Sequence, residues 1–216
     1  MRNSRKFWSR KVSIYDEEGV KNMKLTAKAA KDLLDKAWKT ANNDGWIRHS
    51  ICVGDTAAVI AEGLGLEDPD YARALGYVHD IGKYLDEVDV KWHDVKGYKF
   101  LLEQGIDEQD AFVCLTHSYI NGDYRCQAGG IPELHPLRCE VLQAHEYNIY
   151  EHIINLCDLM CIFETMTMEK RLIDLLIRKG IHENTHYHLL AALELKQKFD
   201  TMLGYNLYRL FPDIQI

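Results

Sequence analysis

Hydrophobic residues recur at intervals of three and four positions through most of this 216-residue chain, and only four prolines interrupt it. This spacing places apolar side chains on one face of an α-helix, and no stretch shows the strict alternation of a half-buried strand. We therefore predict an all-α fold, built as a single-domain helical bundle. The predicted helices cover residues 26–41, 46–62, 71–84, 93–103, 107–119, 137–147, 153–168, 168–179 and 187–203.

The two ends of the chain set the predicted domain boundaries. Residues 1–24 begin with a basic stretch that lacks the apolar core of a secretory signal, so we predict an N-terminal extension there. Residues 25–216 are long enough and apolar enough to bury one sizeable core, with the motifs of interest between about 46 and 163. The apolar tail at 207–216 either buries itself or pairs with another subunit, which leaves a homodimer as one prediction.

Composition narrows the partners and the cellular setting. The formal net charge is −7, so no basic surplus is present to bind a nucleic-acid backbone, and the sequence carries no strong signal for a nucleic-acid partner. No stretch reaches the ~18 apolar residues of a membrane span, so we expect no membrane partner. The six cysteines form no Cys-x-x-Cys pair, and most fall in apolar helical patterns. This usage is typical of reduced thiols in a cytoplasmic protein.

The most informative motif is the pentapeptide His79-Asp80-Ile81-Gly82-Lys83, which follows an apolar segment predicted to be a buried helix. A neutral imidazole and a carboxylate are both good ligands for divalent metals. Gly82 has no side chain and lets another segment approach the backbone closely. Lys83 follows His79 by about one helical turn, so we predict that it projects from the same face. A cation beside a metal site favours an anionic substrate, most simply a phosphate.

Further candidate ligands lie in other predicted helices. His49, His117 and Asp158 each have apolar residues three or four positions away. A buried carboxylate without a partner costs on the order of several kcal/mol, so Asp158 needs a cation, a hydrogen-bond network or a metal. His93 has polar neighbours, as a ligand lining a wet cleft would have. Taken singly, each of these histidines is more often a core residue than a ligand.

The order of these residues is a lone His, then His-Asp-x-Gly-Lys, then two His and a distal Asp. This order resembles the HD-domain superfamily of metal-dependent phosphohydrolases, and it implies an HD-type helical domain that holds one or two divalent metals. Mixed nitrogen and oxygen ligands suit Fe, Mn, Co, Ni or Zn. The resemblance implies a first ion held by His49, His79, Asp80 and Asp158, and a second held by His93 and His117, with Asp80 bridging both.

The resemblance also implies a function. We expect a phosphomonoesterase or phosphodiesterase that hydrolyses a nucleotide or another small phosphate ester with a metal-activated hydroxide. Asp80 would orient the nucleophile, and Lys83 would bind the substrate and stabilise charge on its phosphate oxygens. Tyr124 and Arg125 lie in an irregular segment after His117 and are predicted to contact the substrate.

Other interpretations stay open at this level. The chain lacks the Gly-Tyr-Pro signature of the cyclic-dinucleotide phosphodiesterase branch, because Gly97-Tyr98 is followed by Lys99. That argues against the branch without excluding cyclic substrates. The histidines at 182, 186 and 188 are predicted to lie on the solvated surface. A metal-supported nucleotide sensor without turnover and a metal-free helical interaction protein are the alternative functions.

Overall fold

The computed structural model describes residues 23–85, 91–125 and 133–214. Within these ranges the chain forms helices and two isolated bridges but no named strand, which confirms the all-α prediction. The α-helices are α1 (Ala27–Trp38), α2 (Gly45–Gly63), α3 (Pro69–Val78), α4 (His93–Glu103), α5 (Glu108–Thr116), α6 (Pro136–Ala144), α7 (Ile149–Asp158), α8 (Met168–Lys179) and α9 (Thr185–Leu203). The 3₁₀ segments are η1 (Ile81–Tyr84), η2 (Ile120–Gly122) and η3 (Leu207–Leu210).

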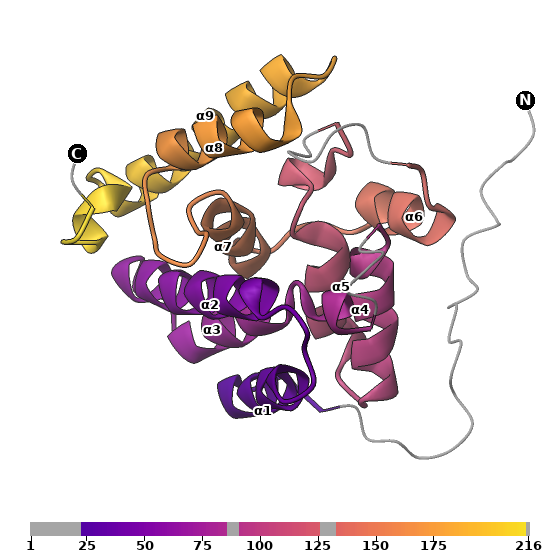
Figure 1. The fold of residues 1–216 in the computed structure, drawn as a ribbon. Helices are drawn as coiled ribbons and strands as arrows, with labels where there is room; N and C mark the ends of the chain where they lie inside the picture. The colour runs from indigo at the N-terminus through magenta and orange to yellow at the C-terminus, as the bar shows by residue number, and fades with distance from the viewer. Residues whose placement is uncertain (1–22, 86–90, 126–132, 215–216) are drawn as a thin grey trace, which may run out of the picture.

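The helices pack around α7, in which Ile153, Ile154, Leu156 and Cys157 are fully buried (Figure 1). α7 contacts α2, α3, α5 and α9. On one side of it, α2 and α3 lie together with α1 packed on α3, and α4 pairs with α5. On the other side, the hairpin of α8 and α9 crosses over α7 (Figure 1). As a result, the C-terminal ends of α3, α5 and α7 meet in the interior of the molecule.

α2 and α3 pack with their backbones in direct contact. A Cβ atom on Gly76 of α3 would lie 2.4 Å from the Cα of Gly54 in α2, so the two backbones touch directly. Only glycine, which has no Cβ atom, allows two backbones to approach this closely. This contact brings His49 of α2 beside the end of α3, where His79 follows.

One predicted helix is interrupted at the pentapeptide His79–Lys83. The apolar pattern predicted a continuous helix at 71–84, but α3 ends at Val78 and the chain turns before η1 begins. Asp80 has φ −105° and ψ 9°, outside the helical region. The residues on both sides of the turn are buried, so the apolar pattern continues without interruption across the end of α3. The pattern therefore could not show where the helix ends, and the backbone angles of the structure do.

A second predicted helix is also too long at its C-terminal end. The predicted segment 153–168 ends at Asp158, and the chain then folds back as Met166 donates its N–H to the carbonyl of Met160 at 2.8 Å. Its beginning is earlier than predicted, because Asn148 and Glu151 form a capping box that starts α7. Leu159, Met160 and Cys161, directly beyond Asp158, are buried by tertiary packing although they lie outside the helix.

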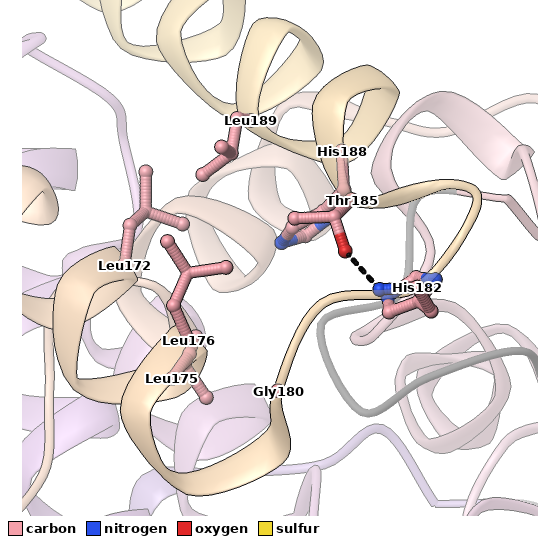
Figure 2. Close-up of a pocket in the computed structure, with 8 residues that line it drawn as sticks. All are labelled: Leu172, Leu175, Leu176, Gly180, His182, Thr185, His188 and Leu189. Atoms are coloured by element: carbon pink, nitrogen blue, oxygen red, sulfur yellow. Dashed lines mark hydrogen bonds between the residues drawn. The ribbon is translucent and has the colours of Figure 1, made fainter.

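The connection between α8 and α9 contains an apolar cavity and a pair of hydrogen bonds between His182 and Thr185, one of which Figure 2 shows. Leu172 and Leu175 of α8 and Leu189 of α9 line the same small cavity, and the His182 N–H donates to Thr185 Oγ1 at 2.8 Å. The cavity holds about 10 Å³, close to the room that a single water needs. The cavity therefore lies between the two helices, while Arg171, Asp174 and Arg178 of α8 line a second, larger cavity.

Several other predictions can be compared with the described residues. The five described cysteines are free thiols, and Cys114, Cys157 and Cys161 are buried, as expected for reduced core cysteines. Among the described helices, none is long and apolar enough to cross a membrane. Leu207 and Tyr208 of the apolar tail are buried. Most of the predicted extension 1–24 lies outside the described residues, so that boundary stays a prediction, as do the homodimer and the cytoplasmic setting.

Candidate metal centre

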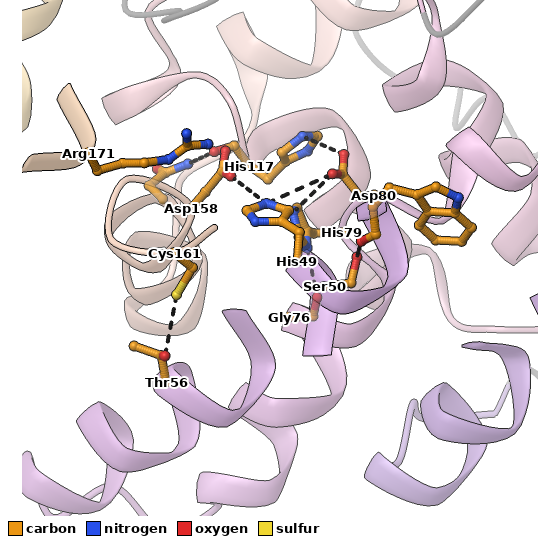
Figure 3. Close-up of polar contacts among 12 residues, drawn as sticks. His49, Ser50, Thr56, Gly76, His79, Asp80, His117, Asp158, Cys161 and Arg171 are labelled. Atoms are coloured by element: carbon orange, nitrogen blue, oxygen red, sulfur yellow. Dashed lines mark hydrogen bonds and ion pairs between the residues drawn. The ribbon is translucent and has the colours of Figure 1, made fainter. Parts of the chain in front are cut away.

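The six side chains predicted as metal ligands come together at one place, which we call the metal-centre cluster. Figure 3 shows all of them except His93. Most of them stand at or next to a helix end, where side chains from different helices can converge on one point. The cluster consists of His49 from α2, His79 and Asp80 from the turn after α3, His93 from the first residue of α4, His117 from the residue after α5 and Asp158 from the end of α7.

Two of the imidazoles have a defined orientation. The Nδ1 atom of His79 donates to the Gly76 carbonyl at 2.7 Å, and Nδ1 of His117 donates to the Cys114 carbonyl at 2.8 Å. Because a carbonyl only accepts, each ring carries its proton on Nδ1 and directs the Nε2 lone pair into the cluster. His79 Nε2 is buried without a hydrogen-bond partner among the described residues. A histidine oriented through one nitrogen and open at the other fits a metal ligand.

Asp80 lies between two pairs of histidines. Its Oδ2 atom is 3.6 Å from His79 Nε2 and 3.9 Å from His49 Nε2. Its Oδ1 atom is 3.2 Å from His93 Nε2 and 3.6 Å from His117 Nε2. The carboxylate therefore turns one oxygen toward each pair, which is the geometry needed to bridge two ions.

Asp158 completes the cluster on the side of α2 and α7. Its Oδ1 atom accepts a hydrogen bond from His49 Nε2 at 2.9 Å, so this carboxylate has the partner that its apolar helix face requires. One turn earlier, Asn155 donates from Nδ2 to the carbonyls of Thr116 at 2.9 Å and His117 at 2.6 Å. Asn155 thus ties α7 to the end of α5, a role that the sequence pattern did not indicate.

Burial and neighbouring charges set the protonation of the cluster. Burial lowers the pKa of His79 to about 3. Burial acts to raise the pKa of Asp80, but the ammonium of Lys83 and the nearby His79 hold it well below its ordinary value. Burial also acts to raise the pKa of Asp158, and the hydrogen bond from His49 lowers it. Neutral imidazoles and ionised carboxylates are the forms that bind divalent metals.

The glycine and the lysine of the pentapeptide have distinct roles. A Cβ atom on Gly82 would lie 1.8 Å from the carbonyl oxygen of His93, so η1 and the first turn of α4 approach each other directly. This confirms the predicted close approach at Gly82. Lys83 was predicted to lie beside the metal ligands, and its ammonium pairs with Asp80 Oδ2 at the edge of the cluster.

Comparison with known families decides the classification. The HD domain family matches residues 46–160, which include the whole metal-centre cluster and more than half of the chain. The chain belongs to the HD domain family. This confirms the resemblance inferred from the order of the His and Asp residues, and with it the assignment as a metal-dependent phosphohydrolase.

Two solved structures are similar to this HD domain protein. The crystal structure of the L. monocytogenes phosphodiesterase PgpH HD domain in complex with cyclic-di-AMP is 17% identical, with a TM-score of 0.47, and the match covers 86% of this chain and 99% of that chain. A second crystal structure of the L. monocytogenes PgpH HD domain is 18% identical, with a TM-score of 0.44, and the match covers 80% and 95%. Similarity at this level assigns no substrate to the present chain.

A buried ion pair supports the HD domain beside His93. Arg138 of α6 donates from Nε to Asp94, and both side chains are almost completely buried. The Arg138 guanidinium also lies 5.2 Å from the ring centroid of Trp92 and 5.3 Å from that of Tyr119. Since Asp94 follows His93 directly, this pair holds the first turn of α4.

The metal-centre cluster forms part of the lining of a cleft of about 650 Å³, a volume typical of small-molecule sites. α8 supplies Arg171, Arg178 and Lys179 to the same cleft, and α9 supplies His188. The prediction of a solvated surface is wrong for His188, which is buried because its face of α9 turns inward, whereas His186 is exposed as predicted.

The two residues predicted to contact the substrate lie apart from the cleft. Arg125 pairs through Nη2 with Asp123 Oδ2 at 2.6 Å, and its guanidinium is 4.3 Å from the ring centroid of Tyr187. Tyr124 is exposed. Neither is among the described residues that line the cleft. Their contact with substrate therefore stays a prediction, without support from their position.

Proposed function

We propose that this HD domain protein hydrolyses a phosphomonoester or phosphodiester of a nucleotide at a centre of two divalent metal ions. The position of Asp80 carries the proposal, since one carboxylate oxygen faces His79 and His49 and the other faces His93 and His117. A buried carboxylate with a purely structural role would need only one cation or a few hydrogen-bond donors to balance its charge. A buried carboxylate surrounded by four imidazoles suits a pair of metal ions.

The donor set fits first-row transition metals. Nitrogen and carboxylate ligands suit Fe, Mn, Co, Ni or Zn better than Ca, which prefers oxygen alone. Bound ions of this kind supply an activated water at neutral pH and neutralise charge on the phosphate. In the proposed arrangement one ion is held by His49, His79, Asp80 and Asp158, and the other by His93, His117 and the shared Asp80.

Other residues of the cleft would position the substrate. Lys83 lines the cleft beside Asp80, where its ammonium would bind a non-bridging phosphate oxygen as charge develops. Phe163 also lines the cleft and is 52% exposed, with the Arg48 guanidinium 4.5 Å from its ring centroid. An exposed aromatic ring offers a surface on which a nucleobase can stack. This feature favours a nucleotide over a simpler phosphate ester.

Turnover and metal content together test the proposal. The purified full chain is loaded in turn with Mn²⁺, Fe²⁺, Co²⁺, Ni²⁺ and Zn²⁺. It is then assayed with p-nitrophenyl phosphate, bis-p-nitrophenyl phosphate and a nucleotide panel that includes cyclic-di-AMP. We expect metal-dependent hydrolysis that a chelator abolishes. His79→Ala should lower both bound metal and kcat/KM, the latter by at least about 10²-fold, the scale on which central electrostatic groups contribute.

His186→Ala is the matched control, because His186 is exposed and lies outside the cluster. It should keep both metal and activity. Bound metal and bound nucleotide without turnover on any substrate would indicate a sensor module. Less than one transition metal per chain, with no effect of His79→Ala on metal content, would indicate a metal-free helical protein instead.

A further inference from the structure

One side of the cleft is formed by α8, which lies beyond the residues 46–160 matched by the HD domain family. We call its four cleft-lining polar residues the α8 wall: Arg171, Asp174, Arg178 and Lys179. The first three follow at intervals of three and four positions, so they share one helix face. The cleft as a whole is lined by four permanent cations and three carboxylates, although the chain carries a net charge of −7. Cations are therefore concentrated where an anionic substrate would bind.

Arg171 is the unusual member of the α8 wall. It is only 8% exposed, and its Nη1 donates to Asp174 Oδ2 at 2.6 Å. Its Nε–H is buried without a hydrogen-bond partner among the described residues. Figure 3 shows the Arg171 side chain extending from α8 toward Asp158, on the side of the cluster away from Asp80. Buried polar groups in native proteins are nearly always hydrogen-bonded, so an unpaired donor in a cleft indicates a ligand.

Asp174 holds the guanidinium of Arg171 in place. The same carboxylate accepts two hydrogen bonds from Arg178 Nε, at 3.0 Å to each oxygen, and one from Arg178 Nη2 at 2.6 Å. The hydrogen bonds from Arg178 lower the pKa of Asp174, so it stays ionised. One ionised carboxylate therefore orients two arginines, and the free edge of Arg171 is set before any substrate arrives.

We propose that Arg171 is a second anion-binding subsite, which binds a phosphate group of the substrate other than the one that is hydrolysed. This inference rests on the proposed function for the assignment of the reacting phosphate to the metal-centre cluster. The planar guanidinium matches two phosphate oxygens at once, which an ammonium does not. The enzyme accordingly selects substrates with at least two phosphate groups over substrates with one.

Equilibrium binding tests the subsite without requiring turnover. Inorganic phosphate, pyrophosphate and tripolyphosphate are titrated calorimetrically into the full chain, both Mn²⁺-loaded and chelator-treated. We expect Arg171→Gln to weaken pyrophosphate and tripolyphosphate by about tenfold or more, the scale of a charge-assisted hydrogen bond, and to weaken phosphate much less. Lys170→Gln is the matched control, because it removes the same charge from an exposed position on α8 outside the cleft.

Equal weakening of phosphate and pyrophosphate, or no weakening of either, would overturn the subsite. Arg171→Lys keeps the charge beside Asp174 but lacks the planar fork, so it should show a smaller but still selective loss, and it replaces Arg171→Gln if that variant fails to fold. Failure of the proposed function would look different. A chain without hydrolytic activity would still bind pyrophosphate in a manner that depends on Arg171, since the chelator-treated titration involves neither metal nor turnover.

Discussion

The metal-centre cluster and the α8 wall face the same cleft but are built on opposite principles. The cluster gathers side chains from five helices, and its imidazole His79 is held neutral by burial. The α8 wall comes from a single helix and presents two guanidinium groups. The cluster is therefore a product of long-range packing, whereas the wall needs little more than helical periodicity. We infer that the reaction depends on the first and the choice of substrate on the second.

The two regions also differ in how they are supported. Glycine contacts and a buried ion pair between Arg138 and Asp94 fix the backbone around the cluster. The α8 wall depends on one shared carboxylate, Asp174, which is partly exposed. Substitutions beside the cluster should therefore affect stability and metal content together, and substitutions in the wall should affect neither to the same extent.

The largest effect is expected from a comparison of two carboxylates in the same cleft. Asp80→Asn should lower bound metal and reduce kcat/KM by about 10²–10³-fold or more, since it removes the charge shared by both proposed ions. Asp174→Asn should leave the metal stoichiometry unchanged. Elemental analysis and steady-state kinetics check both variants. Loss of metal from Asp174→Asn would remove the distinction between the two regions.

The buried ion pair should contribute strongly to stability. Asp94→Asn leaves the Arg138 guanidinium buried without its charge partner, so we expect about 3–5 kcal/mol of destabilisation in urea unfolding. The matched control is Asp32→Asn, which breaks the exposed Lys28–Asp32 pair and should have no measurable effect. Similar unfolding midpoints for the two variants would show that the pair does not support the first turn of α4.

Acidification should destabilise the metal-free protein through His79. The unfolded state takes up a proton at this residue below about pH 6.5, whereas the folded state does so only below about 3. Between these values the unfolded state binds more protons, so the free energy of unfolding rises with pH and is lost on acidification, by on the order of a few kcal/mol. Urea titrations from pH 3 to 7 measure the slope.

A variant without the titrating ring provides the control for that slope. His79→Gln should flatten it, while Arg171→Lys should not change it, because both side chains at that position stay charged over the whole range. An unchanged slope in His79→Gln would assign the acid sensitivity to other groups.

Backbone contact at the pentapeptide predicts a smaller effect on stability. Gly82→Ala would force η1 away from the His93 carbonyl, which should cost about 1–3 kcal/mol and weaken metal binding at the side of His93. Gly63→Ala is the control, because its Cβ would meet only the flexible end of Leu210. Unfolding curves of both variants measure the cost of overpacking, and metal titrations measure any displacement of His93. Normal metal binding by Gly82→Ala would contradict the expected weakening at His93.

The smallest effect is expected at Arg125. Its guanidinium pairs with Asp123 and stacks on Tyr187, apart from the cleft, so Arg125→Ala should leave KM nearly unchanged. A clear rise in KM for a nucleotide substrate would indicate that Arg125 contacts the substrate, as the sequence predicted. Substrate selection would then not depend on the α8 wall alone.

Several local features could be predicted because they depend on short stretches of chain. The bounds of α4 at 93–103 agree with the prediction, and so does the close approach at Gly82. The breaks after Val78 and Asp158 were missed, because buried residues continue the apolar pattern through both turns. Arg171 was missed for another reason. An arginine on an amphipathic helix is usually solvated, and no pattern in the sequence indicates that this one is buried in a cleft.

The sequence by itself indicated the helical class through the spacing of its hydrophobic residues, and the family and the chemistry through the order of its His and Asp residues. Tertiary structure alone decided that Asp80 turns one oxygen to each pair of histidines, that Arg138 holds the first turn of α4, and that α8 faces the metal-centre cluster. Those relations join residues far apart in the chain, and the packing that brings them together has no local signature.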